Sequence, residues 1–466
     1  MTLIPLPMDD VLLLAQRLEQ EGDLVFADRT LLRALEAVPE WPEALHLSGI
    51  VAFRLGRRDE AVEKLERAIV NGNAKGSDIR LFFRNIAEVY RAVDRFDDAV
   101  SAGKKAVALW PDDPISLYNL AVIHYHRLEL DACINAAERA LALNGSLPGP
   151  HFQLAEALLL RGEWERGWHE YQWRFNLPGN LPLMPPTDKP RWVGTPLPDG
   201  TLLVIADQGF GDVIQFSRYI PWAAERCGAI AVACAPEMIP VLRQVHPAAR
   251  LFSEWSDCPP FQAFRAMSGL PGLHQTRPDF IPGTVPYLRA DPDRALFWKE
   301  RLDRLTPSGV RRIGIVWAGR PSHNNDHWRS ASLRAFATLA SVPGIALVSL
   351  QKGPAADQAG QYFGAAPLIN LGAEIADFDD TMGILAALDL VVTVDTSVGH
   401  LAGAMGRPAF IMLARAPDWR WLLDRSDTPW YPTVRLVRQT MTGAWDEVMA
   451  TIAASVTAFI GHPRRV

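Results

Sequence analysis

The chain has 466 residues, of which 48% are hydrophobic and 21% charged, and its formal net charge is -6 at pH 7. This length exceeds what one hydrophobic core usually supports, so two or three domains are expected. The acidic balance argues against broad nucleic-acid binding, because neutralising phosphates needs clustered Lys and Arg. No apolar run reaches the roughly 18 residues that would predict a transmembrane helix.

The N-terminus and the cysteines both bear on where the protein acts. Residues 1–10 have neither a basic start nor a long apolar stretch, which predicts no signal peptide and a cytoplasmic protein. The cysteines show no C-x-x-C spacing, so they predict reduced and mostly buried thiols rather than a metal site. They are Cys133, Cys227, Cys234 and Cys258.

A small residue followed seven positions later by alanine recurs through the first third of the chain. The copies are Ala27 with Ala34, Ala61 with Ala68, Ala99 with Ala106, Cys133 with Ala140, and a partial one at Gly167. They lie 34, 38, 34 and 34 residues apart, and the longer step coincides with a Gly-rich insert at 71–79. About 34 residues is the period of tetratricopeptide (TPR) repeats. A generic helical bundle with accidental spacing is the alternative, and five phased copies count against it.

We therefore predict a TPR helical repeat domain, an α-solenoid, over residues 1–175. Such arrays usually grip a peptide or another protein on their concave face. The aromatic-rich helix at 162–175 is predicted to pack against the next domain rather than to bind a ligand. Residues 176–200 are rich in Pro and Gly, which predicts a linker.

Beyond the linker, short apolar strands alternate with amphipathic helices, which predicts parallel sheets with right-handed crossovers. The expected strands are 201–207, 229–235, 249–253, 312–318, 346–351, 367–372, 388–395 and 408–413. A charged helix is expected within 291–310. We predict two Rossmann-like lobes, 201–308 and 309–466, that face a cleft beyond the carboxyl ends of the strands. A final helix near 443–460 is expected to brace the first lobe.

The loop after the first of these strands reads DQGFGD (207–212). Gly209 and Gly211 allow a tight turn and a close approach to a ligand. Asp212 has two interpretations: an N-cap of the helix expected to start there, or a carboxylate general base that activates an acceptor hydroxyl at the cleft.

A second loop, VDTSVGHLAGAMGRP (394–408), follows another strand. Asp395 ends that strand, and Thr396 and Ser397 lead into a helix whose free N–H groups suit a phosphate. His400, one turn into the helix, could donate to a phosphoryl oxygen. The alternative is a capped core helix with an internally satisfied histidine.

Further polar residues follow other strands of the second lobe. The segment 317–330 contains H-x-x-D-H, but we favour a polar loop that closes on a diphosphate through Arg320 or Arg329 over a metal site. Gln351 and Lys352 end a strand on the same side of the sheet. The D-x-D within 377–380 is attributed to helix capping.

Taken together, DQGFGDVIQFSRYIP, VDTSVGHLAGAMGRP and APDWRWLLDRSDTPWYP resemble bacterial TPR proteins with a C-terminal glycosyltransferase domain. That domain is similar to the heptosyltransferases (glycosyltransferase family 9), which have the GT-B fold. The resemblance covers essentially the whole chain and implies that Asp212 is the catalytic base. It also implies that the motif of Thr396, Ser397, His400 and Leu401 contacts the donor diphosphate. The family's donor-binding Lys is missing from 324–330, where Arg329 could substitute.

The resemblance makes inverting, metal-independent sugar transfer the leading hypothesis, with a nucleotide sugar as co-substrate and no other cofactor. The repeats are absent from lipopolysaccharide heptosyltransferases, so they suggest a protein acceptor. Two alternatives stay open: a non-catalytic scaffold with a degenerate transferase module, and a transferase directed at a glycan or lipopolysaccharide.

Overall fold

The computed structural model describes residues 7–178, 183–323 and 325–461. Its contacts divide the chain into two compact units, Met1–Leu158 with Trp173–Leu177, and Leu159–Gln172 with Pro178–Val466. Residues 1–6, on which part of the signal-peptide prediction rests, and 179–182 of the expected linker lie outside the described residues. Among the described helices, none combines the length and the apolar character that a bilayer span requires.

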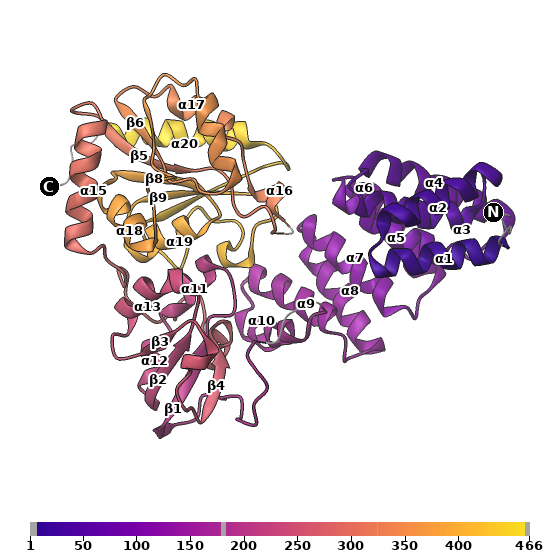
Figure 1. The fold of residues 1–466 in the computed structure, drawn as a ribbon, viewed down its shortest axis with the longest axis horizontal. Helices are drawn as coiled ribbons and strands as arrows, with labels where there is room; N and C mark the ends of the chain where they lie inside the picture. Colours follow the sequence, from indigo (N-terminus) through magenta and orange to yellow (C-terminus); the bar gives the residue numbers. More distant parts are fainter. Residues whose placement is uncertain (1–6, 179–182, 324, 462–466) are drawn as a thin grey trace, which may run out of the picture. The chain divides into compact units, whose positions relative to one another are not determined.

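Residues 8–171 form a series of antiparallel helix pairs, of which the stretch from Leu159 onward belongs to the second unit (Figure 1). The second helices of the pairs begin at Leu24, Arg58, Phe96, Leu130 and Trp164, so their steps are 34, 38, 34 and 34 residues. The repeat period predicted from the sequence is therefore confirmed. The helices are α1 (Met8–Glu21), α2 (Leu24–Ala37), α3 (Pro42–Arg54), α4 (Arg58–Lys75), α5 (Arg80–Ala92), α6 (Phe96–Leu109), α7 (Pro114–His126), α8 (Leu130–Leu143), α9 (Pro148–Arg161) and α10 (Trp164–Tyr171).

Small residues let the paired helices approach. Ala27, Ala61, Ala99 and Cys133 are fully buried where the second helix of each pair meets the first. A Cβ atom at Gly167 would lie 2.7 Å from the side chain of Leu159 on α9. The extra residues of the 38-residue step fall where α4 is prolonged to Lys75, before the chain turns at Gly76.

The aromatic face of α10 packs as predicted, because α10 belongs to the unit that contains the sheets. Trp164, Trp168 and Tyr171 are buried, and the indole N–H of Trp168 donates to the carbonyl of Thr276 over 2.9 Å. The ring of Trp168 meets that of Trp419 edge-on, with centroids 5.2 Å apart. The last repeat helix is therefore built into the α/β unit.

The second unit contains two parallel sheets. The first has the strand order β3-β2-β1-β4, and the second β10-β9-β8-β5-β6-β7. The strands are β1 (Leu197–Ile205), β2 (Cys227–Ala233), β3 (Arg250–Phe252), β4 (Ala263–Ala266), β5 (Arg311–Val316), β6 (Ile345–Ser349), β7 (Leu368–Asn370), β8 (Leu390–Val394), β9 (Ala409–Leu413) and β10 (Val434–Arg438). Every expected strand is present, and β4 and β10 are additional.

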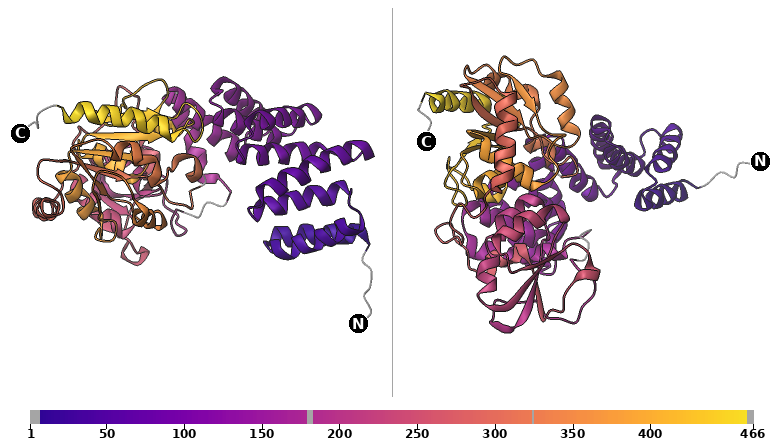
Figure 2. Two further views of the ribbon diagram at one scale, coloured as in Figure 1. Left: turned by 90° about the horizontal axis from the view of Figure 1, so that it is seen from above. Right: turned by 60° about the vertical axis from the view of Figure 1, so that its left-hand side comes forward.

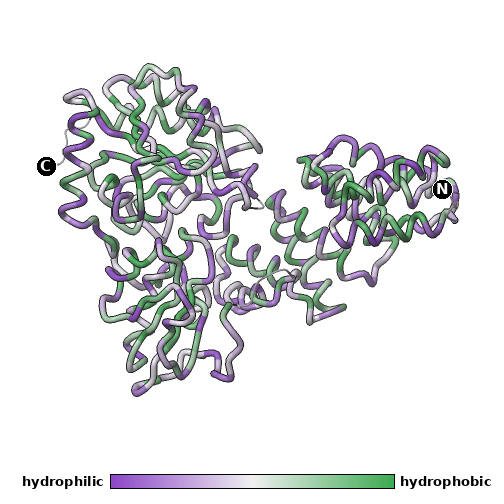
Figure 3. The backbone as a smooth tube through the Cα atoms, in the orientation of Figure 1, coloured by the Kyte–Doolittle hydropathy of each residue, from purple (hydrophilic) through white to green (hydrophobic). Residues whose placement is uncertain are grey.

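Helices cover the second sheet on both faces, with α17 and α20 on one side and α18 and α19 on the other (Figures 1 and 2). The strands between them are mainly apolar (Figure 3), and most of their residues are buried. The main helices of this unit are α11 (Phe210–Ser217), α13 (Ile239–Val245), α15 (Pro292–Leu305), α17 (Ala337–Ala340), α18 (Phe378–Ala387), α19 (Ser397–Ala404) and α20 (Trp445–Ile460).

The prediction that the C-terminal helix braces the first lobe is wrong. Val448, Met449, Ile452 and Val456 of α20 belong to the hydrophobic core of the second sheet, together with Ile313 and other strand residues. An amphipathic helix covers the nearest uncovered apolar face, and here that face belongs to its own sheet.

Candidate functional site

A cavity of about 810 Å³ opens at the carboxyl ends of strands from both sheets. In each sheet, successive strands are first added on one side of the starting strand and later on its other side. The change of side falls between β1 and β4 in the first sheet and between β5 and β8 in the second. Ligands of open parallel sheets bind at such reversal points. The volume is within the range of small-molecule sites, roughly 300–1,000 Å³.

The loop after β1 brings Asp212 to the cavity wall. Helix α11 begins at Phe210 and its N-cap is Gly209, so Asp212 lies in the first turn and the N-cap interpretation is wrong. The loop itself is fixed by Asp207, whose carboxylate accepts hydrogen bonds from the backbone and hydroxyl of Ser268 after β4. Gly211 is small because a Cβ there would lie 2.8 Å from Cδ2 of His400.

Asp212 pairs with a buried arginine that the sequence analysis did not identify. The guanidinium of Arg420, which is 5% exposed, donates to Oδ1 of Asp212 and to both carboxylate oxygens of Asp418, over 2.8 and 2.9 Å. Arg420 lies in the segment APDWRWLL, which contributes to the family resemblance but has no spacing typical of a site. No local pattern relates it to Asp212, since the two partners are 208 positions apart.

On the second sheet, helix α19 starts at the cavity. Its N-cap, Thr396, makes no side-chain capping bond, and its hydroxyl pairs instead with that of Thr393 at 2.9 Å. Thr396, Ser397 and Val398 line the cavity, where the first amides of the helix have no intrahelical acceptors. This helix terminus has the chemistry of an anion site.

Two glycines let α19 lie against its neighbours. A Cβ at Gly399 would be 3.1 Å from Ile411 and 3.2 Å from Thr393, and one at Gly403 only 2.4 Å from the Tyr431 ring. Leu401 is fully buried and does not line the cavity. Its contribution is therefore to packing of the helix.

His400 is 4% exposed, lines the cavity and is also satisfied internally. Its Nδ1 lies 3.0 Å from the hydroxyl of Tyr431, and its Nε2 lies 3.9 Å from Oδ1 of Asp395. Burial, with the Arg420 guanidinium, lowers its pKa to about 4. The imidazole is therefore neutral near pH 7, and it has a single N–H to offer either Tyr431 or the cavity.

Two carboxylates meet beside His400. Burial and the neighbouring Asp418 raise the pKa of Asp395. Burial opposes ionisation of Asp418 as well, but Arg420 outweighs it, and the pKa of Asp418 is lowered. Asp418 is consequently the ionised partner of Arg420, and Asp395 is the group more readily protonated.

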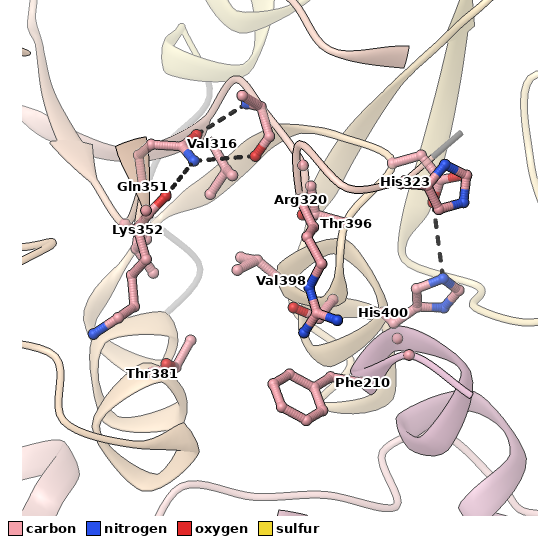
Figure 4. A pocket seen from close by; sticks show the side chains of 18 of the residues that line it. Phe210, Val316, Arg320, His323, Gln351, Lys352, Thr381, Thr396, Val398 and His400 are labelled. Carbon is pink, nitrogen blue, oxygen red and sulfur yellow. Dashed lines mark hydrogen bonds and ion pairs between the residues drawn. The ribbon is translucent and has the colours of Figure 1, made fainter. Parts of the chain in front are cut away.

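Cationic side chains surround the rest of the cavity. Arg320 and Lys352, both exposed, line it from the loops that follow the neighbouring strands β5 and β6 (Figure 4). The Lys352 ammonium also donates to the carbonyl of Ile375. Arg329 is half-buried, with its Nε 3.8 Å from Oδ1 of Asp326. These groups give the cavity wall a positive side next to the α19 terminus.

Gln351 lines the cavity but is occupied internally. Its Oε1 accepts from the backbone amides of Trp317 and Ala318 over 3.0 and 2.9 Å, and its Nε2 donates to the carbonyls of Ala318 and Lys352. It holds the loop after β5 in place, so its contact with a ligand would be indirect.

The structure thus gathers into one cavity all the residues predicted for the site except Leu401. They are Gly209, Gly211, Asp212, Arg320, Arg329, Gln351, Lys352, Asp395, Thr396, Ser397 and His400. The capping role of the D-x-D segment is confirmed, because Asp377 accepts from the amide of Asp380 at the start of α18. Within the described ranges, no cluster of three His, Cys, Asp or Glu side chains is arranged to hold a metal ion.

Comparison with known proteins gives one curated relative. The chain is 27% identical over 446 residues to the protein FlbA of Caulobacter vibrioides, covering 87% of this chain and 71% of FlbA. No protein-family model matches it.

Solved structures resemble about a third of the chain. PilF of Pseudomonas aeruginosa is 19% identical, with a TM-score of 0.34 over 37% of this chain and 78% of PilF. YrrB, described as a TPR protein with an unusual peptide-binding site, is 15% identical, with a TM-score of 0.31 over 36% of this chain and 84% of YrrB.

Proposed function

We propose that the chain is a glycosyltransferase of GT-B type that moves a sugar from a nucleotide-sugar donor to a hydroxyl acceptor. One observation carries the proposal. A single cavity has on one wall a carboxylate paired with a buried arginine, Asp212 with Arg420, and on the other the open terminus of α19 beside cationic side chains. A base facing an anion site is the arrangement that transfer from a sugar diphosphate needs.

The donor diphosphate would lie at the start of α19. The amides of Ser397 and Val398 and the side chains of Arg320, Arg329 and Lys352 would bind its oxygens. As the bond from the anomeric carbon to the diphosphate oxygen breaks, these groups would stabilise the charge that develops on the leaving phosphate. With this much positive charge from the chain itself, we propose that transfer needs no metal ion.

The acceptor hydroxyl would approach from the Asp212 side. Its oxygen forms the new bond to the anomeric carbon while its proton passes to the Asp212 carboxylate, so that sugar, proton and leaving diphosphate balance. Attack from the face opposite the diphosphate inverts the configuration at the anomeric carbon. Arg420 pairs with the Asp212 carboxylate, and an opposite charge at this distance favours the ionised form that accepts the proton.

We further propose that the acceptor is a protein that binds the repeat helices and that the reaction is cytoplasmic. Stacked helical repeats offer an extended surface for peptides and partner proteins. The rival acceptor, a glycan, would give a different product. Intact-mass analysis of co-purified proteins after incubation with the donor separates the two, since only a protein acceptor gains the mass of the sugar.

The test starts with calorimetric binding of nucleoside diphosphates, followed by a screen of nucleotide sugars for nucleotide release. We expect one nucleoside diphosphate to bind and its sugar conjugate to turn over, at a rate unchanged by EDTA. Asp212→Asn should reduce turnover by at least a hundredfold and leave nucleotide binding intact. Asp199→Asn, at an exposed position of β1, should change neither turnover nor binding. Failure of every nucleotide to bind would instead favour the scaffold alternative.

A further inference from the structure

Each nitrogen of the Arg420 guanidinium donates a hydrogen bond, and these bonds connect the segment after β9 to α11. Its Nε donates to Oε1 of Gln215 over 2.7 Å, and its Nη2 donates to Asp212 and, over 3.3 Å, to Oε1 of Gln208. All three acceptors lie on α11 or the loop that precedes it. Arg420 therefore fixes the element that carries Asp212, and does so through three separate side chains.

Arg420 is itself held from behind. Asp418 accepts from its Nη1 through both carboxylate oxygens and from its backbone amide over 2.9 Å. The guanidinium lies 4.3 Å from the centre of the Trp419 ring and 5.3 Å from that of Phe216. A guanidinium that is hydrogen-bonded along both edges and stacked on an aromatic ring has little rotational freedom.

Helix α10 completes this arrangement. The hydroxyl of Tyr171 accepts from Nε2 of Gln208 over 3.1 Å, and Gln208 in turn accepts from Arg420. The rings of Trp168 and Tyr171 meet Trp419 edge-on, at 5.2 and 5.8 Å between centroids. The helix that closes the repeat series thus contacts both a hydrogen-bond partner and the stacking partner of Arg420.

We propose that Arg420 positions Asp212 for its role as base, and that Tyr171 of helix α10 keeps Arg420 in place through Gln208. The inference rests on the proposed function and adds to it: the last repeat helix is part of the catalytic unit. Tyr171 and Arg420 are positioning residues, since neither needs to touch the acceptor.

Arg420 can act on Asp212 in two ways, through its positive charge and through the position in which it holds the carboxylate. Arg420, from the segment after β9, pairs with Asp212, and the charge of Asp212 also acts on His400 of α19. Asp418 and Tyr171 act in turn on Arg420. Near neutral pH His400 is uncharged and Asp418 ionised, so Arg420 is the cation that favours the ionised base. Removing its charge should shift the acidic limb of the pH profile, whereas disturbing only its geometry should lower turnover at every pH.

The experiment measures the pH dependence of kcat/KM for Arg420→Gln, Arg420→Lys and Tyr171→Phe. Arg420→Gln should move the acidic limb upward by about 1–3 pH units. Arg420→Lys should leave the limb in place but lower kcat, and Tyr171→Phe should lower kcat about fivefold with an unchanged donor KM, as expected for one lost hydrogen bond. An unshifted limb in Arg420→Gln, or an unchanged kcat in Tyr171→Phe, overturns the proposal.

Matched controls lie elsewhere in the same unit. Arg311→Gln breaks another arginine–aspartate pair, with Asp389, at the amino end of β5. Tyr362→Phe removes a hydroxyl that donates to the carbonyl of Ala366 over 2.6 Å outside the cavity. Both should leave the limb and kcat unchanged.

A second readout needs no turnover. Carboxyl carbon NMR with labelled aspartate, assigned by comparison with Asp212→Asn, gives the titration of Asp212 directly. If no donor is turned over, yet the Asp212 resonance titrates at higher pH in Arg420→Gln than in the native chain, the proposed function fails while the pairing stands. The same titration in both proteins would overturn the positioning role.

Discussion

Gly211 and His400 are packed so closely that a Cβ atom on the glycine would lie 2.8 Å from Cδ2 of the imidazole. The ring cannot yield easily, because Tyr431 binds it on one side and Trp421 lies 5.2 Å away between ring centroids. This contact joins α11, which carries Asp212, to α19, which carries the anion site. Because Gly211 has no Cβ atom, α11 and α19 can lie this close, and this contact sets the distance between Asp212 and the anion site.

Gly211→Ala should therefore push the two helices apart. We expect a loss of about 1–3 kcal/mol in the free energy of unfolding, the usual effect of overpacking a tight contact. Urea denaturation measures it, and nucleoside diphosphate affinity should fall in parallel. Gly360→Ala is the matched control, because a Cβ there meets no atom within 4 Å; equal effects of the two substitutions would contradict the prediction.

His400 should make stability depend on pH. Its pKa is about 4 in the folded chain, against the ordinary histidine value of 6.5, so between these values the unfolded chain binds a proton that the folded chain does not. The contribution is fully present above pH 6.5 and is lost as pH falls toward 4, amounting to about 3 kcal/mol at most. Urea titrations at several pH values should show a weaker decline for His400→Gln than for the native chain. Exposed His169→Gln should behave like the native chain, and an identical decline in His400→Gln would refute the assignment.

Arg320 should contribute to anion binding through charge. The side chain is exposed, so its effect is modest and screened by salt: we expect Arg320→Gln to raise the Kd of a nucleoside diphosphate about fivefold at low ionic strength and less at high. Calorimetry at two salt concentrations measures both effects. Arg334→Gln, exposed and outside the cavity, should change neither. A salt-independent loss in Arg320→Gln would point to a role in packing instead.

Trp168 should stabilise the α/β unit although it lies on the last repeat helix. It is 3% exposed and its indole donates to Thr276, so Trp168→Ala should cost about 3–5 kcal/mol. Differential scanning calorimetry should show a lower Tm for the transition of the α/β unit. Trp255→Ala, where the residue is 38% exposed, should cost much less. A native Tm in Trp168→Ala would mean that α10 packs only loosely.

The sequence predicted the features that repeat or alternate. Buried small residues at a fixed period located the helix pairs, and apolar runs located eight strands, because each pattern is local. Strand β4 could not be predicted from an apolar run, because its four residues include a buried arginine, Arg265, which is hydrogen-bonded to Gln172 outside the strand. In β10, Arg435 and Arg438 interrupt the apolar run in the same way. Most residues of the candidate site could also be predicted, because they directly follow the carboxyl ends of predicted strands.

The pairing of Asp212 with Arg420 could not be predicted in that way. Asp212 follows a strand of the first sheet and Arg420 follows a strand of the second, so no sequence periodicity relates them. The two meet because Trp419 and α10 pack around Arg420 and fix its position. The direction in which α20 would pack was misjudged for a similar reason. Its apolar stripe specifies that a face is buried, but not which sheet buries it.

The distance along the chain between Asp212 and Arg420 also orders events during synthesis. At about 5–20 residues per second, a ribosome needs roughly 10–40 s to proceed from one to the other. Until then Gln208, Asp212 and Gln215 lack the guanidinium that binds all three in the finished fold, and Trp164 and Trp168 lack Trp419. The nascent first sheet therefore leaves the ribosome with an aromatic and polar surface uncovered, and a chain truncated before residue 418 should need a chaperone to remain soluble.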